Sequence, residues 1–242
     1  MSKLPARWHS SRLEREVEVV RWGDTGTPVL VFPTAGGDAE EVERFHLVEA
    51  CGPLLESGRV KLYSCDSING RALLTHEGTA GHRCWLLRQF LEFVRHEVVP
   101  AIRADCRDPE IEVIAAGPSI GAYNALACVG RYPDVFRSAV CMSGTYDLRR
   151  FIDGEVTDDF YWASPIDFVP TLAGEALDAT RRRFIVIASG QGANEDIGES
   201  WLVGRVLGEA GVPNRVDPWG EEWAHDWPLW RTMLPGYLDE LT

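Results

Sequence analysis

The sequence lacks any long apolar run. No stretch approaches the ~20 consecutive apolar residues that a membrane-spanning helix needs. Residues 1–7 also lack the apolar core of a secretion signal. We therefore expect no membrane partner and predict a cytoplasmic location.

Paired cysteines and an excess of basic residues are also missing. The six cysteines are scattered without a C-x-x-C pair, so we expect reduced, mostly buried thiols rather than a disulfide framework or zinc site. Against 37 acidic residues there are only 24 basic ones, and the charge of −13 disfavours nucleic acid as a partner. We expect neither a metal nor another cofactor, and the sequence is compatible with a homo-oligomer.

The composition and the order of elements are those of a globular α/β protein. Hydrophobic residues make up 45% of the chain, enough for a packed core, and its 242 residues fit one domain spanning 1–242. Short β-branched runs alternate with longer helical ones, which predicts a mostly parallel central sheet flanked by helices. The predicted strands cover residues 16–22, 29–32, 60–64, 111–115, 138–142, 184–188 and 215–219. The predicted helices cover residues 39–57, 82–104, 119–131, 198–210 and 227–241.

Two segments stand apart from this alternation. The strand at 16–22 is followed by a Gly-Asp-Thr-Gly turn, and we expect it to begin an antiparallel edge of the sheet. The segment 148–182 shows no regular pattern and holds several aromatic residues among prolines and acidic residues. A connection of this length inside a compact domain is more often a functional cap than a plain loop.

The clearest chemical motif is Gly117-Pro118-Ser119-Ile120-Gly121. It follows a predicted buried strand and precedes a helix rich in small residues, the context in which G-x-S-x-G forms a nucleophile elbow. A sharp strand-to-helix turn exposes the serine oxygen, and the glycines avoid collisions with neighbouring backbone. We predict Ser119 as a catalytic nucleophile.

A serine nucleophile needs a base, which is in turn held by an acid. With an elbow of this kind the chain order is Ser, then Asp or Glu, then His. His225 is the one histidine after Ser119, and it lies between the last predicted strand and the last helix. The acid is expected after the strand at 184–188, where Glu195 and Asp196 are both candidates. Either could instead favour the start of the following helix.

Two other carboxylates are better explained structurally. Asp226 precedes Trp-Pro and is predicted to cap the last helix. Asp147 is a reserve acid that we expect to hold its own turn through backbone hydrogen bonds.

The oxyanion side is predicted in the turn after the strand at 29–32. This Pro-Thr-Ala-Gly-Gly turn is glycine-rich, and we assign the two N–H donors to Ala35 and to Ile120, the residue after the nucleophile. Further residues are expected to line a substrate pocket: Thr34, Phe160, Tyr161, Trp162 and Trp223.

In its order of motifs the chain resembles the putative-esterase group of α/β-hydrolases, which includes esterase D-like and mycolyltransferase-like enzymes. The resemblance rests on Phe32-Pro-Thr-Ala-Gly-Gly, the elbow, Arg131-Tyr-Pro-Asp-Val-Phe leading to Met142-Ser-Gly-Thr-Tyr-Asp147, and Trp223-Ala-His225-Asp-Trp-Pro. It implies an α/β-hydrolase fold and hydrolysis of a small carboxylic ester through an acyl-enzyme. Relatives commonly carry an aspartate near the position of Ala193, and a His-Gly turn where this chain has Pro33-Thr34.

Three functions follow from these residues. The leading one is a serine esterase. The same triad could serve an acyltransferase, in which an alcohol replaces water as the acceptor. The departures at Ala193 and Pro33-Thr34 also allow a catalytically silent fold used for binding, which would be favoured if Glu195 and Asp196 both pointed away from His225.

Overall fold

The computed structural model describes residues 2–242 and is built on an eight-stranded mixed sheet. The strand order is β1-β2-β4-β3-β5-β6-β7-β8. The first two pairings, β1 with β2 and β2 with β4, are antiparallel, and all others are parallel. The strands are β1 (Lys3–Ser10), β2 (Arg15–Trp22), β3 (Thr27–Val31), β4 (Val60–Cys65), β5 (Val113–Pro118), β6 (Phe136–Met142), β7 (Phe184–Ser189) and β8 (Asn214–Pro218).

All seven predicted strands are confirmed, with ends that shift by at most three residues. β5 is buried along its whole length, and β3 and β7 are buried beyond their first residue, which explains the apolar runs of these three strands. The expected antiparallel pairing of β2 is confirmed, but its place at the sheet edge was wrong, because β1 lies outside it. β1 is mostly exposed and contains Pro5, and proline is tolerated on an edge strand.

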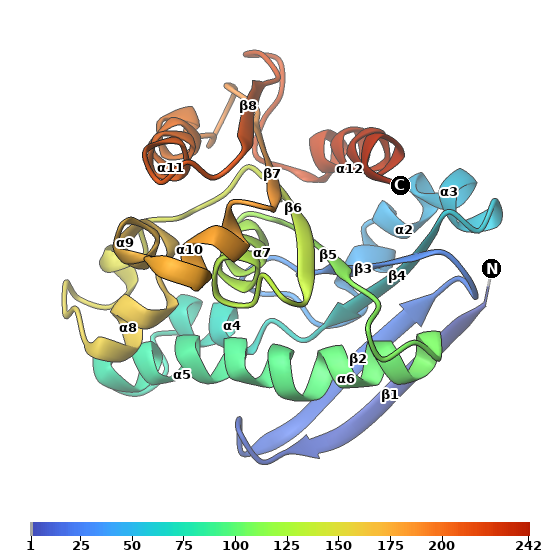
Figure 1. Ribbon diagram of the computed structural model, residues 1–242, viewed down its shortest axis with the longest axis horizontal. Helices are drawn as coiled ribbons and strands as arrows, with labels where there is room; N and C mark the ends of the chain where they lie inside the picture. The colour runs from blue at the N-terminus through green and yellow to red at the C-terminus, as the bar shows by residue number, and fades with distance from the viewer. Residues whose placement is uncertain (1) are drawn as a thin grey trace.

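Helices cover both faces of the sheet (Figure 1). One face packs against α5 (Ala80–Phe93), α6 (Val99–Cys106), α7 (Ile120–Arg131) and α11 (Ile197–Glu209). The other packs against α1 (Glu41–Arg44), α2 (Leu47–Ala50), α3 (Gly52–Glu56) and α12 (Trp227–Leu241). Among the described residues, no helix combines the length and apolar character needed to cross a membrane.

Two predicted helices differ from the observed ones. The single helix expected over 39–57 is three short ones, because His46 adopts a left-handed conformation and Pro53 begins a new turn. The helix expected over 82–104 continues to Cys106, but a π-helical turn, η1 (Val94–Val98), interrupts it. Pro100 follows directly and has no N–H to donate, which favours such an irregular turn.

The segment 148–182 is a series of short helices rather than an irregular cap. It contains η2 (Arg149–Phe151), α8 (Asp158–Ala163), α9 (Pro165–Phe168), η3 (Val169–Thr171) and α10 (Gly174–Thr180). α8 and α9 lie beside α5 and α7 (Figure 1), and Phe160 and Phe168 join the core on that face. One more short helix, α4 (Ile68–Leu74), was not predicted; it follows β4.

Candidate active site

The candidate residues meet where β5 to β8 end. Pro118 pairs with Met142, and Met142 pairs with Ala188, so the chain leaves three neighbouring parallel strands at the same edge. Ser119 is the first residue after β5, and Ser143 is the first after β6. Adjacent strands lie about 4.8 Å apart, so these two serines leave the sheet side by side.

Ser119 occupies a strained backbone conformation, with φ +57° and ψ −122°. Its N–H donates to Met142 O (2.9 Å), and its carbonyl accepts from Ala122 N (3.1 Å). A Cβ on Gly121 would lie 2.3 Å from Phe32 O, so only glycine lets the elbow approach β3 this closely. Such a conformation costs roughly 1–3 kcal/mol and persists only where its surroundings hold it.

A small cavity of about 70 Å³ lies beside Ser119. Ala35 and Ile120, the two predicted oxyanion donors, both line it. Ile120 is the first residue of α7, so its N–H has no acceptor within the helix. The N–H of Ala35 donates to no group within residues 2–242. The remaining walls are mostly apolar: Gly70, Leu73, Leu74, Thr145 and Phe151.

Glu41 holds the turn that carries Ala35. Its two carboxylate oxygens accept from Thr34 N and Thr34 Oγ1, both at 2.7 Å. Burial raises the pKa of Glu41 above its usual value, although the hydrogen bonds from Thr34 oppose this. The predicted pocket residue Thr34 therefore lies next to the cavity with its hydroxyl engaged by Glu41.

Of the two candidate acids, Glu195 contacts His225. Glu195 Oε2 lies 3.3 Å from His225 Nδ1, and the carboxylate also accepts from Ser143 Oγ (2.5 Å) and Ser189 Oγ (3.1 Å). Its side chain is 1% exposed. Burial alone would raise the pKa of Glu195, but hydrogen bonds from His225, Ser143 and Ser189 outweigh it and hold this pKa below its usual value.

The other carboxylates have structural partners. Asp196 caps α11 by accepting from Gly198 N (3.0 Å), and Asp226 caps α12 by accepting from Trp227 N (2.7 Å), which confirms the predicted cap. Asp147 accepts from Arg149 N (3.0 Å) and so holds its own turn, as expected. The condition that would favour a silent fold is not met, since Glu195 points toward His225.

Three residues near the candidate triad were not predicted. Ser143 and Ser189 hold Glu195, and Trp230 Nε1 donates to Ser143 Oγ (2.9 Å). The Trp230 ring also stands perpendicular to the His225 ring, with centroids 5.2 Å apart. Trp230 is a buried residue of α12, and nothing in the local sequence pairs its indole with a serine 87 residues away.

The predicted aromatic wall lies elsewhere. Tyr161 is 40% exposed and its hydroxyl donates to Thr171 Oγ1. Trp162 packs between the guanidinium groups of Arg88 and Arg131, 5.0 and 4.7 Å from its ring centroid. These two and Phe160 belong to α8, which packs toward α5 rather than over Ser119. Trp223 packs edge-on against Trp219, in the loop between β8 and α12 that also carries His225.

Comparison with known proteins shows the family of the chain. The model of the family described as "Putative esterase" matches residues 63–238. No curated protein matches the chain at the sequence level.

Solved structures resemble the chain over nearly its full length. A ferulic acid esterase superposes with a TM-score of 0.74 at 15% identity, covering 100% of this chain and 98% of that one. An S-formylglutathione hydrolase from Agrobacterium tumefaciens gives 0.74 at 12%, covering 98% and 93%. A fluorophosphonate-binding serine hydrolase, FphF from Staphylococcus aureus, gives 0.75 at 13%, covering 99% and 98%. The fold is therefore that of the α/β-hydrolases, as predicted.

Proposed function

Because the chain belongs to the Putative esterase family and is a carboxylic ester hydrolase, we propose that it forms an acyl-enzyme on Ser119. The observation that carries this proposal is the contact between Glu195 and His225 Nδ1, at the sheet edge where Ser119 is held in its strained turn. His225 would act as the base and Glu195 as the acid that orients it.

The contact with Glu195 assigns a role to each ring nitrogen of His225. Nδ1 keeps its proton and donates to Glu195, which leaves Nε2 as the nitrogen able to accept the Ser119 proton. Hydrogen bonds hold the pKa of Glu195 low, so the carboxylate is ionised at neutral pH. Its charge then stabilises the imidazolium that forms as the proton moves.

The reaction would proceed in two halves. His225 takes the proton of Ser119 Oγ as that oxygen attacks the ester carbonyl, and the backbone N–H groups of Ala35 and Ile120 bind the oxyanion. The intermediate collapses as His225 gives its proton to the leaving alcohol, and the acyl group stays on Ser119. Water then attacks with His225 again as base, which releases a carboxylic acid and restores the serine.

The size of the cavity supports a short acyl group. Its volume of about 70 Å³ equals roughly two water molecules at about 30 Å³ each. Leu73, Leu74 and Phe151 make the walls largely apolar. We therefore propose acetyl to butyryl esters as the preferred substrates, with the rate falling for longer chains.

Labelling with a fluorophosphonate probe tests the nucleophile. We expect the wild type to be labelled, Ser119→Ala to lose the label, and Ser57→Ala, at an exposed serine far from the sheet edge, to be labelled like the wild type. Labelling that persists in Ser119→Ala would overturn the assignment. A wild type that does not react would overturn the proposal of a serine nucleophile.

Product analysis distinguishes hydrolysis from transfer. With p-nitrophenyl acetate and added alcohol acceptors, a hydrolase releases acetate at a rate that the acceptor does not reduce. Accumulation of a new ester at the expense of acetate would show an acyltransferase that uses the same triad.

A further inference from the structure

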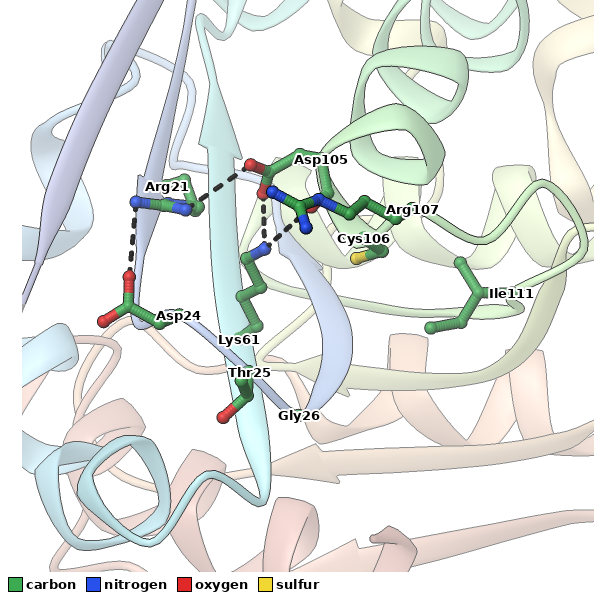
Figure 2. A pocket seen from close by; sticks show the side chains of 9 residues that line it. All are labelled: Arg21, Asp24, Thr25, Gly26, Lys61, Asp105, Cys106, Arg107 and Ile111. Atoms are coloured by element: carbon green, nitrogen blue, oxygen red, sulfur yellow. Dashed lines mark hydrogen bonds and ion pairs between the residues drawn. The ribbon is translucent and has the colours of Figure 1, made fainter.

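Figure 2 shows the lining of a second cavity, of about 430 Å³. It opens at the opposite end of the parallel strands from Ser119. It lies where β3 and β4 begin and where α6 ends, whereas Ser119 follows the far end of β5. The six residues of β5 span roughly 20 Å at about 3.3 Å per residue. The cavity is therefore separate from the candidate active site.

Charged side chains dominate this cavity. Arg21, Lys61 and Arg107 face the two carboxylates of Asp24 and Asp105, which leaves an excess of positive charge. The chain as a whole carries −13, so a local positive excess is unusual for this protein. Figure 2 shows the three basic side chains directed toward the same hollow.

Asp105 is already occupied by groups of the protein. Its Oδ2 lies 2.6 Å from Lys61 Nζ and accepts from Tyr63 OH at 2.6 Å. The Lys61 side chain is only 4% exposed, so this ion pair is largely shielded from water. Burial would raise the pKa of Asp105, but the hydrogen bonds from Lys61 and Tyr63 outweigh it and lower this pKa. Asp105 thus neutralises Lys61.

The two arginines are left poorly neutralised. Arg21 reaches Asp105 Oδ1 and Asp24 Oδ1 only at 3.4 and 3.6 Å, and Asp24 is 70% exposed. Asp24 Oδ1 also accepts from Ser2 Oγ at 2.6 Å, so it is shared between two donors. Arg107 forms no ion pair within residues 2–242. Arg21 therefore shares the Asp105 carboxylate with Lys61, and Arg107 borders the cavity with no carboxylate paired to it among residues 2–242 (Figure 2).

We propose that this cavity binds a small organic anion through a phosphate or carboxylate group held by Arg21 and Arg107. The guanidinium fork matches both groups in shape, and charge-assisted hydrogen bonds are the stronger ones. The volume lies within the range of roughly 300–1,000 Å³ that is usual for small-molecule sites. Binding here does not depend on the chemistry at Ser119.

Cys106 provides a direct probe of occupancy. It lines the cavity and is partly exposed, whereas the other five cysteines are buried. Alkylation by iodoacetamide, which is uncharged, can be followed by peptide mass spectrometry with inorganic phosphate or succinate added. Sodium chloride at matched ionic strength controls for screening. We expect millimolar phosphate or succinate to slow alkylation of Cys106 about fivefold, and comparison of the two anions identifies the preferred group.

Charge-removing variants decide the outcome. Arg107→Gln and Arg21→Gln should each raise the anion concentration for half-protection about tenfold. Two control variants should leave the anion concentration for half-protection unchanged. They are Arg205→Gln, at an exposed arginine on α11, and Ser119→Ala. Equal protection by sodium chloride, no protection by either anion, or unchanged protection in Arg107→Gln would overturn the proposal. Arg107 is exposed, so that variant decides the question even if Arg21→Gln does not fold.

Discussion

Glu195→Gln is the smallest change that tests the proposed acid. The amide keeps the length and shape of the buried side chain and can still accept hydrogen bonds from Ser143 or Ser189. It removes the negative charge that faces His225 Nδ1. The variant therefore separates the electrostatic role of Glu195 from its packing.

The distance to His225 sets the expected magnitude. Replacing the acid of a well-studied triad by its amide lowers kcat about 10⁴-fold, because the imidazole adopts the wrong tautomer. The 3.3 Å contact observed here is longer than the about 2.7–2.9 Å of a strong charge-assisted bond. We therefore expect a loss nearer to 10³-fold, which corresponds to about 4 kcal/mol in the transition state.

Hydrolysis of p-nitrophenyl acetate, with active sites counted by the fluorophosphonate probe, gives kcat directly. Asp196→Asn is the matched control, since it makes the same chemical change one residue away. Asparagine caps a helix about as well as aspartate, so we expect kcat within about twofold of the wild type. If Glu195→Gln retains more than about a tenth of the activity, or if Asp196→Asn loses as much, the assignment of Glu195 is wrong.

Acid stability provides an independent check on the same residue. The pKa of Glu195 is lowered in the folded protein, so its contribution to stability is fully present above the usual value of 4.5. That contribution is lost as the pH falls through the lowered pKa. In Glu195→Gln this part of the acid dependence should disappear from melting temperatures measured between neutral and strongly acidic pH.

Three further variants test the surroundings of the site. Trp230→Phe removes the donor to Ser143 but keeps a ring against His225, and we expect kcat/KM to fall about tenfold. Trp227→Phe is the control and should have little effect, because the indole N–H of Trp227 donates to no group within residues 2–242. Burial raises the pKa of the Glu41 carboxyl, so its ionisation destabilises the folded protein at neutral pH. Glu41→Gln should therefore raise the melting temperature at neutral pH, and this gain should vanish below pH 4.5, the usual pKa of glutamate. Gly121→Ala places a Cβ 2.3 Å from Phe32 O. We expect this collision to cost about 1–3 kcal/mol of stability, measured by denaturant unfolding. It should also displace Ser119, which a lower kcat would report.

Local patterns were sufficient to predict the sheet and the elbow. Seven strands were predicted from short β-branched runs, and three of these, now β3, β5 and β7, are the nearly continuous apolar runs typical of buried parallel strands. Ser119 was predicted as the nucleophile because a single pentapeptide carries both the serine and the glycines that its turn requires. His225 was predicted as the base from its place between the last strand and the last helix, a feature of chain order.

Contacts between distant segments could not be predicted in the same way. Glu195 and Asp196 are neighbours in sequence, and the direction of each side chain depends on the preceding turn, where Asn194 adopts φ +62°. The walls of the cavity come from α4 and from Phe151, neither of which has a sequence signal for lining a pocket. The aromatic residues of α8 were misplaced because their hydrophobicity serves the core and two arginines instead.

The hydrogen bonds around Glu195 explain how a glutamate can serve at this site. The backbone of Ala193, near where relatives carry an aspartate, accepts from His225 N at 2.9 Å. The side chain that faces Nδ1 comes from two residues later and has one more rotatable bond than aspartate. Fixing a flexible side chain costs conformational entropy, and here Ser143 and Ser189 each hold one carboxylate oxygen. Trp230 in turn fixes Ser143, so in this chain the orientation of His225 depends on three residues outside the proposed triad.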